Sequence, residues 1–71
     1  MIKRGDLVQY LDNSKGLSLN KTYEVDKITG HYVYVYSNLN VITFDSMRYF
    51  RLATKQEANR YLISKMFNSE V

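Results

Sequence analysis

The 71-residue sequence predicts a small all-β domain, a five-stranded barrel followed by one amphipathic α-helix. Five short segments alternate apolar and polar residues with the period of two that marks half-buried strands. After residue 53 the apolar spacing changes to three and four residues, which is typical of a helix. An open sheet of five short strands would expose two edges, so we expect a small closed or nearly closed barrel.

Turn-forming residues separate the strands. Residues 12–16, DNSKG, predict a loop, and Asn20 can supply a left-handed turn residue. Short turns at Gly30 and at residues 37–40 join three consecutive strands, which indicates an antiparallel meander. The predicted strands are GDLVQYL (5–11), the stretch around TYEVD (22–26), HYVYVYS (31–37), VITF (41–44) and MRYFRLA (47–53).

The helix begins with a capping box. The Thr54 hydroxyl can accept the Glu57 N–H, and the Glu57 carboxylate can accept the Thr54 N–H. We expect one domain over residues 1–71, with the barrel at 4–53 and the helix at 54–67. The apolar helix positions Ala58, Tyr61, Leu62 and Met66 predict that the helix covers one open end or one face of the barrel.

The predicted core follows from the inward positions of the strands and from the helix face. A chain of this length buries only about 60% of its unfolded surface, so its stability depends on close packing of large side chains. The predicted core residues are Val8, Tyr10, Leu19, Tyr23, Val25, Val33, Val35, Ile42, Phe50, Leu52 and Leu62.

The composition excludes several classes of site. The chain has no cysteine and one histidine, so we expect neither disulfides nor a metal site. Ten basic and seven acidic residues give a net charge of +3, which permits an anionic partner without requiring one. No segment reaches the roughly 20 apolar residues of a membrane span, and MIKRGD lacks the apolar run of a signal peptide. We therefore expect a cytoplasmic protein with no cofactor.

Residues 4–54 contain four short motifs: Gly5-Asp6, Gly16-Leu17-Ser18, Lys21-Thr22-Tyr23-Glu24-Val25 and Phe50-Arg51-Leu52-Ala53-Thr54. In this the chain resembles the small SH3-like barrels encoded by bacteriophages. Asn20 stands where that family usually has glycine. The resemblance implies an SH3-like barrel made in the host cytoplasm. It transfers no catalytic residue, because SH3-like barrels host many unrelated activities.

Three tyrosines alternate with two valines in HYVYVYS. If Tyr32, Tyr34 and Tyr36 face outward, they could stack nucleic-acid bases. They could also form a protein interface, where tyrosine is enriched because it adds contact area at little cost in rotamer entropy. Alternatively, the rings simply cover the sheet or pack beneath the helix, since cross-strand aromatics stabilise sheets without any ligand.

The basic residues allow a nucleic-acid alternative. Lys27, Arg48 and Arg51 would hold phosphates if the tyrosines stack bases. Glu24 and Asp26 interleave with the lysines of the second strand and would repel a phosphate backbone. A solvated basic surface is therefore the favoured interpretation.

Catalysis is not expected. His31 is the only imidazole, and no cysteine, glycine-framed serine or carboxylate cluster accompanies it. On the helix, Ile63 and Phe67 widen the apolar stripe beyond one contact face. We expect them to join the outward tyrosines in an exposed apolar patch for a partner or a second copy of the chain.

The leading hypothesis is a small phage accessory protein, not an enzyme, that binds a host protein and modulates or inhibits it. Nucleic-acid binding is the alternative, and a homodimer is a further expectation. The predicted partner-binding residues are Tyr32, Tyr34, Tyr36, Tyr49, Ile63 and Phe67.

Overall fold

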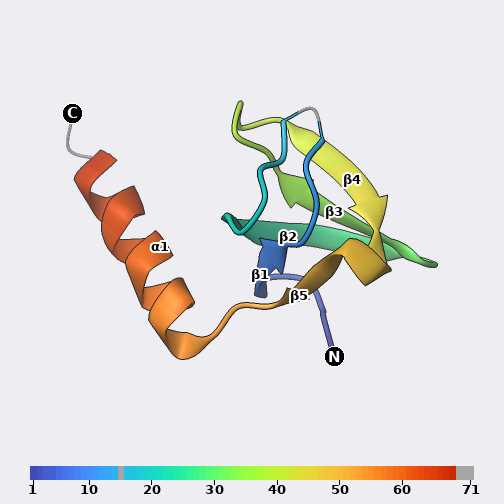
Figure 1. The fold of residues 1–71 in the computed structure, drawn as a ribbon, viewed down its shortest axis with the longest axis horizontal. Helices are drawn as coiled ribbons and strands as arrows, with labels where there is room; N and C mark the ends of the chain where they lie inside the picture. The colour runs from blue at the N-terminus through green and yellow to red at the C-terminus, as the bar shows by residue number, and fades with distance from the viewer. Residues whose placement is uncertain (15, 69–71) are drawn as a thin grey trace.

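The computed structural model describes residues 1–14 and 16–68, with side chains up to Met66. Figure 1 shows the strands gathered on one side and the helix projecting away from them. In chain order the elements are β1 (Leu7–Tyr10), β2 (Thr22–Thr29), β3 (Tyr32–Tyr36), β4 (Ile42–Ser46), the 3₁₀ turn η1 (Met47–Tyr49), β5 (Phe50–Leu52) and α1 (Lys55–Asn68).

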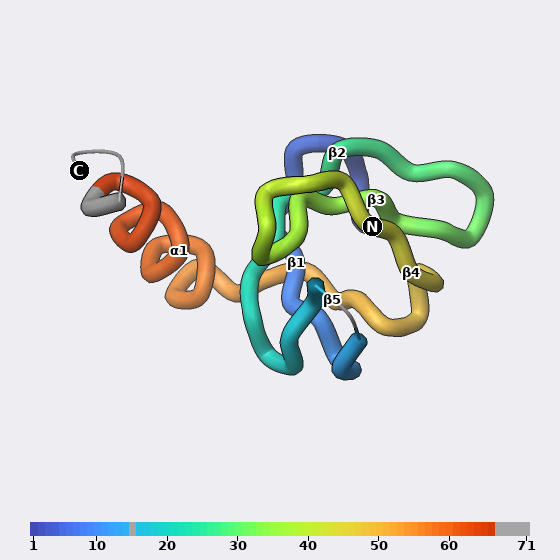
Figure 2. Tube along the Cα trace, turned by 90° about the horizontal axis from the view of Figure 1, so that it is seen from above, coloured from blue at the N-terminus to red at the C-terminus, as the bar shows by residue number. Residues whose placement is uncertain are grey.

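The five strands form one antiparallel sheet in the order β4-β3-β2-β1-β5. The sheet curls round its buried face, and η1 alone bridges its two edge strands, β4 and β5 (Figure 2). Among the described residues the two edges do not pair, so the barrel is incompletely closed. The predicted fold class, all-β with a small five-stranded barrel and one C-terminal helix, is confirmed.

The core lies inside the curl and draws on β1, β2, β3, β5 and one loop residue. A tilted ring contact between Tyr10 and Phe50, with centroids 5.2 Å apart, closes it on the β5 side. The buried residues are Val8, Tyr10, Leu17, Tyr23, Val25, Val33, Val35 and Phe50. All of them except Leu17 are predicted core residues.

The prediction of Leu19 as a core residue is wrong, because Leu17 takes that place. Ser14 and Leu17 exchange two backbone hydrogen bonds of 3.1 Å, which fold the loop back and turn Leu17 inward. Leu19 is exposed and its N–H donates to the Asn13 side chain at 3.0 Å. A loop has no fixed period, so the choice between two nearby leucines depends on its hydrogen bonds.

Three further core predictions are also wrong. Ile42 lies opposite Tyr36 in the β3–β4 register and therefore faces outward with it. Leu52 lies opposite Val8, but β5 is an edge strand. Leu52 therefore has a neighbouring strand on one side only and stays exposed. Leu62 is 50% exposed because α1 stands away from the barrel.

The fifth strand is shorter than predicted. The first part of the predicted segment forms η1, in which the Phe50 N–H donates to the Met47 carbonyl. Only Phe50–Leu52 pair with β1. Met47 and Tyr49 instead pack against the core from η1.

The predicted left-handed turn at Asn20 is confirmed, with φ of 61°. Asn40 has φ of 58° and closes the β3–β4 turn, where its N–H donates to the Ser37 carbonyl at 2.9 Å. Asparagine tolerates this conformation because its short side chain can hydrogen-bond locally. Gly30 turns β2 into β3, also with φ of 58°.

The capping box at the start of α1 is confirmed. The Thr54 N–H donates to Glu57 at 2.9 Å and the Glu57 N–H donates to the Thr54 hydroxyl at 3.2 Å. Arg51 adds a bidentate ion pair to the same carboxylate, at 2.9 and 2.8 Å, which the sequence pattern does not predict. The start of the helix is therefore tied to β5.

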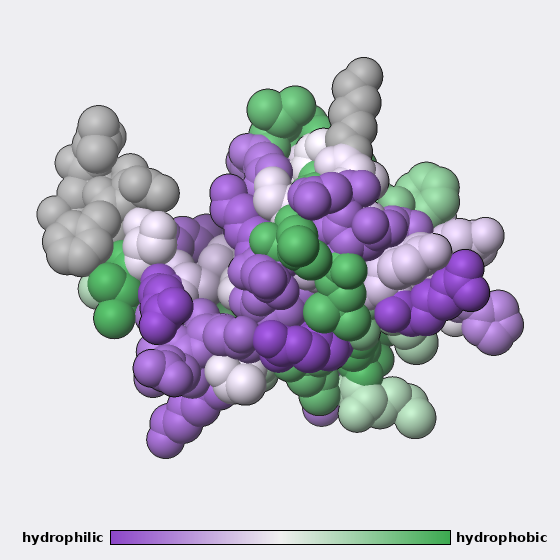
Figure 3. Space-filling view, viewed as in Figure 1, coloured by the Kyte–Doolittle hydropathy of each residue, from purple (hydrophilic) through white to green (hydrophobic). Residues whose placement is uncertain are grey.

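The prediction that the helix covers an open end or a face of the barrel is wrong, because the predicted contact residues Leu62 and Met66 are exposed. Figures 1 and 2 show α1 beside the barrel, with its axis leading away. Its main contact is with β2, where Lys65 lies 3.6 Å from the Glu24 carboxylate. The junction between helix and barrel is largely hydrophilic in Figure 3, whereas apolar residues form a strip over the barrel. None of the helix side chains that the structure describes, up to Met66, belongs to the buried core.

Candidate binding surface

The β3 alternation places valines inside and tyrosines outside. Val33 and Val35 are fully buried, whereas Tyr32 and Tyr36 are 49% and 40% exposed and Tyr34 is half-buried. The register sets this choice, because Val33 and Val35 lie opposite inward positions of β2. The tyrosine row is therefore on the outer face of the sheet, not beneath the helix.

Phe44 joins this row from β4, although it is not among the predicted partner-binding residues. It lies opposite Tyr34, and their rings stack with centroids 5.0 Å apart. It also meets Tyr32 edge-on at 5.5 Å, and it is 54% exposed. Counting back across the turn at residues 37–40 would have placed Phe44 on the tyrosine side. We call the outward cluster of Tyr32, Tyr34, Tyr36 and Phe44 the aromatic face.

Tyr34 is enclosed on both sides. The Lys27 ammonium lies 4.8 Å from its ring centroid on the β2 side, and Phe44 stacks on it from the β4 side. The rings thus pack against one another and against a lysine stem and charge. A nucleic-acid base would have to displace one of these neighbours to stack on Tyr34.

Tyr36 ends the row beside an acidic group. Its hydroxyl donates to Asp26 at 3.1 Å, and this hydrogen bond to a carboxylate raises the pKa of Tyr36. Asp26 sits where the β2–β3 register shifts between Val25 and Lys27. An irregularity in the ladder therefore gives the aromatic face a negative charge at one end.

Tyr49 and the two arginines lie apart from the aromatic face. Tyr49 packs against the core from η1, and the Arg48 guanidinium lies 5.1 Å from its ring centroid. Arg51 is held by Glu57, and this hydrogen-bonded pairing raises the pKa of Arg51 and lowers that of Glu57 to about 2. The structure therefore does not bring Lys27, Arg48 and Arg51 together as one phosphate site.

Ile63, the predicted helix contact that the structure describes, does not extend the aromatic face. Ile63 is exposed, but it lies two positions beyond Tyr61, which places it on roughly the opposite side of a helix with 3.6 residues per turn. Tyr61 is the residue that faces the barrel. Phe67, the other predicted helix contact, has a side chain outside the described residues.

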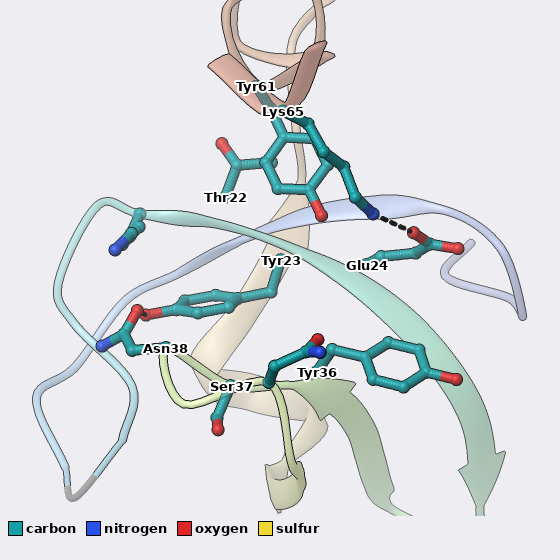
Figure 4. Close-up of a pocket in the computed structure, with 10 residues that line it drawn as sticks. Thr22, Tyr23, Glu24, Tyr36, Ser37, Asn38, Tyr61 and Lys65 are labelled. Atoms are coloured by element: carbon teal, nitrogen blue, oxygen red, sulfur yellow. Dashed lines mark hydrogen bonds and ion pairs between the residues drawn. The ribbon is translucent and has the colours of Figure 1, made fainter. Parts of the chain in front are cut away.

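A polar groove separates α1 from the sheet. Its volume is about 440 Å³, and Tyr36, Tyr61, Lys65 and Glu24 are among its lining residues (Figure 4). The Lys65 ammonium lies 5.6 Å from the Tyr61 ring centroid, and Tyr61 is the main cause of the raised pKa of Lys65. Because Tyr36 lines this groove and also ends the aromatic face, the two surfaces are continuous.

No group of three or more His, Cys, Asp or Glu side chains gathers in a metal-binding arrangement in the described part of the chain. His31 is exposed beside the Gly30 turn. Nor is any helix within the described ranges long and apolar enough to span a membrane. The features available to a ligand are therefore the aromatic face, the polar groove and the edges of the sheet.

Searches against protein-family models, curated proteins and solved structures return no match to this chain. The resemblance to phage SH3-like barrels stays a prediction. What the chain binds has to be argued from its own surfaces.

Proposed function

We propose that this chain is a non-enzymatic binding module that docks a protein partner through its aromatic face. The observation that carries the proposal is the outward cluster of three tyrosines and Phe44 on a rigid antiparallel sheet. Tyrosine rings give large contact area with few rotamers to immobilise, which favours protein interfaces. Ring contacts within the cluster hold the side chains in place before a partner arrives, which lowers the entropy lost on binding.

The aromatic face suits a protein better than a nucleic acid. The ring faces of Tyr34 are taken by Phe44 and Lys27, so its edge and hydroxyl are what a ligand would meet. Asp26 adds a negative charge beside Tyr36, and Arg51 is already neutralised by Glu57. A base-stacking strip needs free ring faces and unpaired cations along the strand.

The biological setting of the proposal comes from the resemblance to phage barrels. In that setting the chain is a small phage accessory protein in the cytoplasm of the host cell. Its partner is a host protein, whose activity it modulates or inhibits by covering a surface. The phage origin rests on the motifs of residues 4–54, and the aromatic face is argued independently of it.

Affinity capture from a bacterial lysate, with and without nuclease, tests the proposal. We expect specific proteins to be retained equally in both arms and to be lost with the double variant Tyr32→Ser, Phe44→Ser. Ile63→Ser is the matched control, because it removes an equally exposed apolar side chain from the helix. Truncating two interface aromatics should weaken binding by at least about 10-fold, equivalent to about 1.4 kcal/mol.

Three results would contradict the proposal. Capture that disappears with nuclease, or that falls steeply as salt is raised, would favour nucleic acid as the ligand. Equal loss with the aromatic and the helix variants would place the contact elsewhere. Circular dichroism of each variant distinguishes a lost contact from a lost fold.

A further inference from the structure

The outer edge of β4 carries backbone groups that the sheet does not use. β4 ends the sheet and pairs only with β3 among the described residues. The Ser37 N–H donates to the Val41 carbonyl at 2.8 Å, and the Met47 N–H donates to the His31 carbonyl at 2.7 Å. In an antiparallel ladder the hydrogen-bonded residues alternate.

The alternation assigns each residue of β4 to one side. Counting between these two bonds, Thr43 and Asp45 bond to β3, and they lie opposite Val35 and Val33. The N–H and C=O groups of Ile42 and Phe44 therefore point away from the sheet. The same count also places their side chains on the outer face, where Ile42 is 51% exposed.

Local contacts limit this edge to a short stretch. At one end the Asn40 N–H is taken by the Ser37 carbonyl. At the other end the Ser46 N–H donates to the Asp45 side chain at 2.7 Å, and η1 begins directly after it. The free backbone groups are thus those of Ile42 and Phe44.

Apart from its short length, this edge lacks the features that keep exposed strands from pairing. Natural edges carry lysine, proline or a bulge, or are very short. The register of β3 with β4 is regular, and residues 41–46 contain no lysine or proline. Their one charge, Asp45, faces the inner side, where it accepts the Tyr10 hydroxyl. The opposite edge, β5, is only three residues long and carries Arg51.

We infer that β4 pairs with β4 of a second copy of this chain, antiparallel, about a two-fold axis at Thr43. In this register Ile42 lies opposite Phe44 of the second copy. Each of these residues then donates its free N–H to the free carbonyl of the other. An aromatic residue across from a β-branched one is a favourable cross-strand pair. This inference does not depend on the proposed partner protein.

The edge is complementary to itself, which is the reason that the occupant is a second copy: the free groups of Ile42 match those of Phe44 in both directions across the two-fold axis. Two chains of net charge +3 repel each other over most of their surfaces, but neither presents a cation on residues 41–46. The register places Asp45 opposite Val41 of the second copy, so the two carboxylates stay about four residues, or roughly 14 Å, apart. The pairing is isologous and therefore stops at a dimer.

Sedimentation over a concentration series tests the dimer. We expect the mass of the native chain to rise from monomer to dimer. Phe44→Lys should remain monomeric at concentrations up to about 1 mM, because it places like charges at the edge of both copies. The Kd of its dimer should therefore lie above about 1 mM. Ile63→Lys is the control and should dimerise like the native chain. A native chain that stays monomeric throughout overturns the inference.

A single introduced cysteine tests the register, since the chain has none of its own. Thr43→Cys should form a disulfide-linked dimer much faster than Ile63→Cys, because the two copies of residue 43 face each other in a non-hydrogen-bonded pair. Faster cross-linking at residue 63 than at residue 43 would overturn this register. Hydrogen exchange supplies a readout without substitution.

At dimer-forming concentrations the amides of Ile42 and Phe44 should exchange at least 10-fold more slowly than in the monomer. Unchanged exchange in a chain that does dimerise would indicate a contact between faces instead of edges. A native chain that stays monomeric while it still captures a lysate protein through the aromatic face would leave the proposed function standing and would make the second-copy inference wrong.

Discussion

At the scale of single residues, the contact between Tyr10 and Asp45 links the first strand to the fourth. Tyr10 is fully buried, and its hydroxyl donates to the Asp45 carboxylate and shares a 3.0 Å hydrogen bond with the Ser14 hydroxyl. Burial, and then the Asp45 carboxylate, raise the pKa of Tyr10. The Tyr10 hydroxyl thereby supplies a hydrogen-bond donor to Asp45, the only charged residue of β4.

Replacing Tyr10 by phenylalanine should therefore be costly although the ring is kept. We expect Tyr10→Phe to lower the free energy of unfolding by about 1.5–3 kcal/mol, because the half-buried Asp45 carboxylate loses one of its two donors among the described residues and keeps only the Ser46 N–H. Tyr32→Phe, on the exposed outer face, should change it by less than about 0.5 kcal/mol. Urea unfolding of the three proteins makes the comparison, and equal stabilities for both variants would contradict the role given to Asp45.

Residue-scale packing also explains which predictions failed. Leu17 and Leu19 have the same side chain, and only the hydrogen bonds between Ser14 and Leu17 turn one of them inward. Ile42 is a predicted core residue, but its register opposite Tyr36 turns it outward, since a shift of one residue in register moves a side chain to the other face. In each case a distant partner, not the residue type, decides burial.

At the scale of elements, the attachment of α1 depends on electrostatics more than on apolar packing. Glu57 accepts Arg51 from β5 and the Thr54 N–H from the cap. Its pKa falls from an ordinary value of 4.5 to about 2, mainly because of Arg51. A carboxyl group whose pKa is lower in the folded state stabilises the fold above its unfolded pKa.

The stabilisation by Glu57 should accordingly be present above pH 4.5 and disappear as the pH falls toward 2. Thermal unfolding of the native chain and of Glu57→Gln measures this. The native chain should unfold at the higher temperature near neutral pH, and the difference should close progressively between pH 4.5 and 2. A difference that is independent of pH would mean that the carboxylate charge is not involved.

At the scale of the whole molecule, the barrel and the helix contribute unequally to the buried core. Within the described residues the buried cluster includes none from α1, and Leu62, Ile63 and Met66 of the helix are exposed. The helix adds the ion pairs of Arg51 and Lys65 and the half-buried Tyr61. Exposed ion pairs contribute little to stability.

Removing residues 54–71 should therefore leave a folded barrel. We expect the shortened chain to keep its β-sheet circular dichroism and to lose only about 1–2 kcal/mol of stability, the scale of one partly buried aromatic side chain. The tyrosine row should remain in place, as two-dimensional NMR of the barrel would show. An unfolded chain would mean that the helix is needed for folding despite its few contacts.

Much of the architecture could be read from the sequence because it is encoded locally. The period of two, the turns at Asn20 and Gly30 and the Thr54–Glu57 capping box each depend on residues close together in the chain. Such features determined the strands, the helix start and the fact that the valines and tyrosines of β3 face opposite ways. They could not say which of those faces is buried.

Tertiary structure decided the rest. The pairing of β3 with both β2 and β4 put the valines inside and gathered Tyr32, Tyr34 and Phe44 outside. It also separated the aromatic face from Ile63 and left β4 at a free edge. These outcomes depend on register between strands and on how far the helix stands from the barrel, which are set by contacts between residues distant in the chain. Alternation determines that a strand has two faces, and only its neighbours determine which one meets solvent.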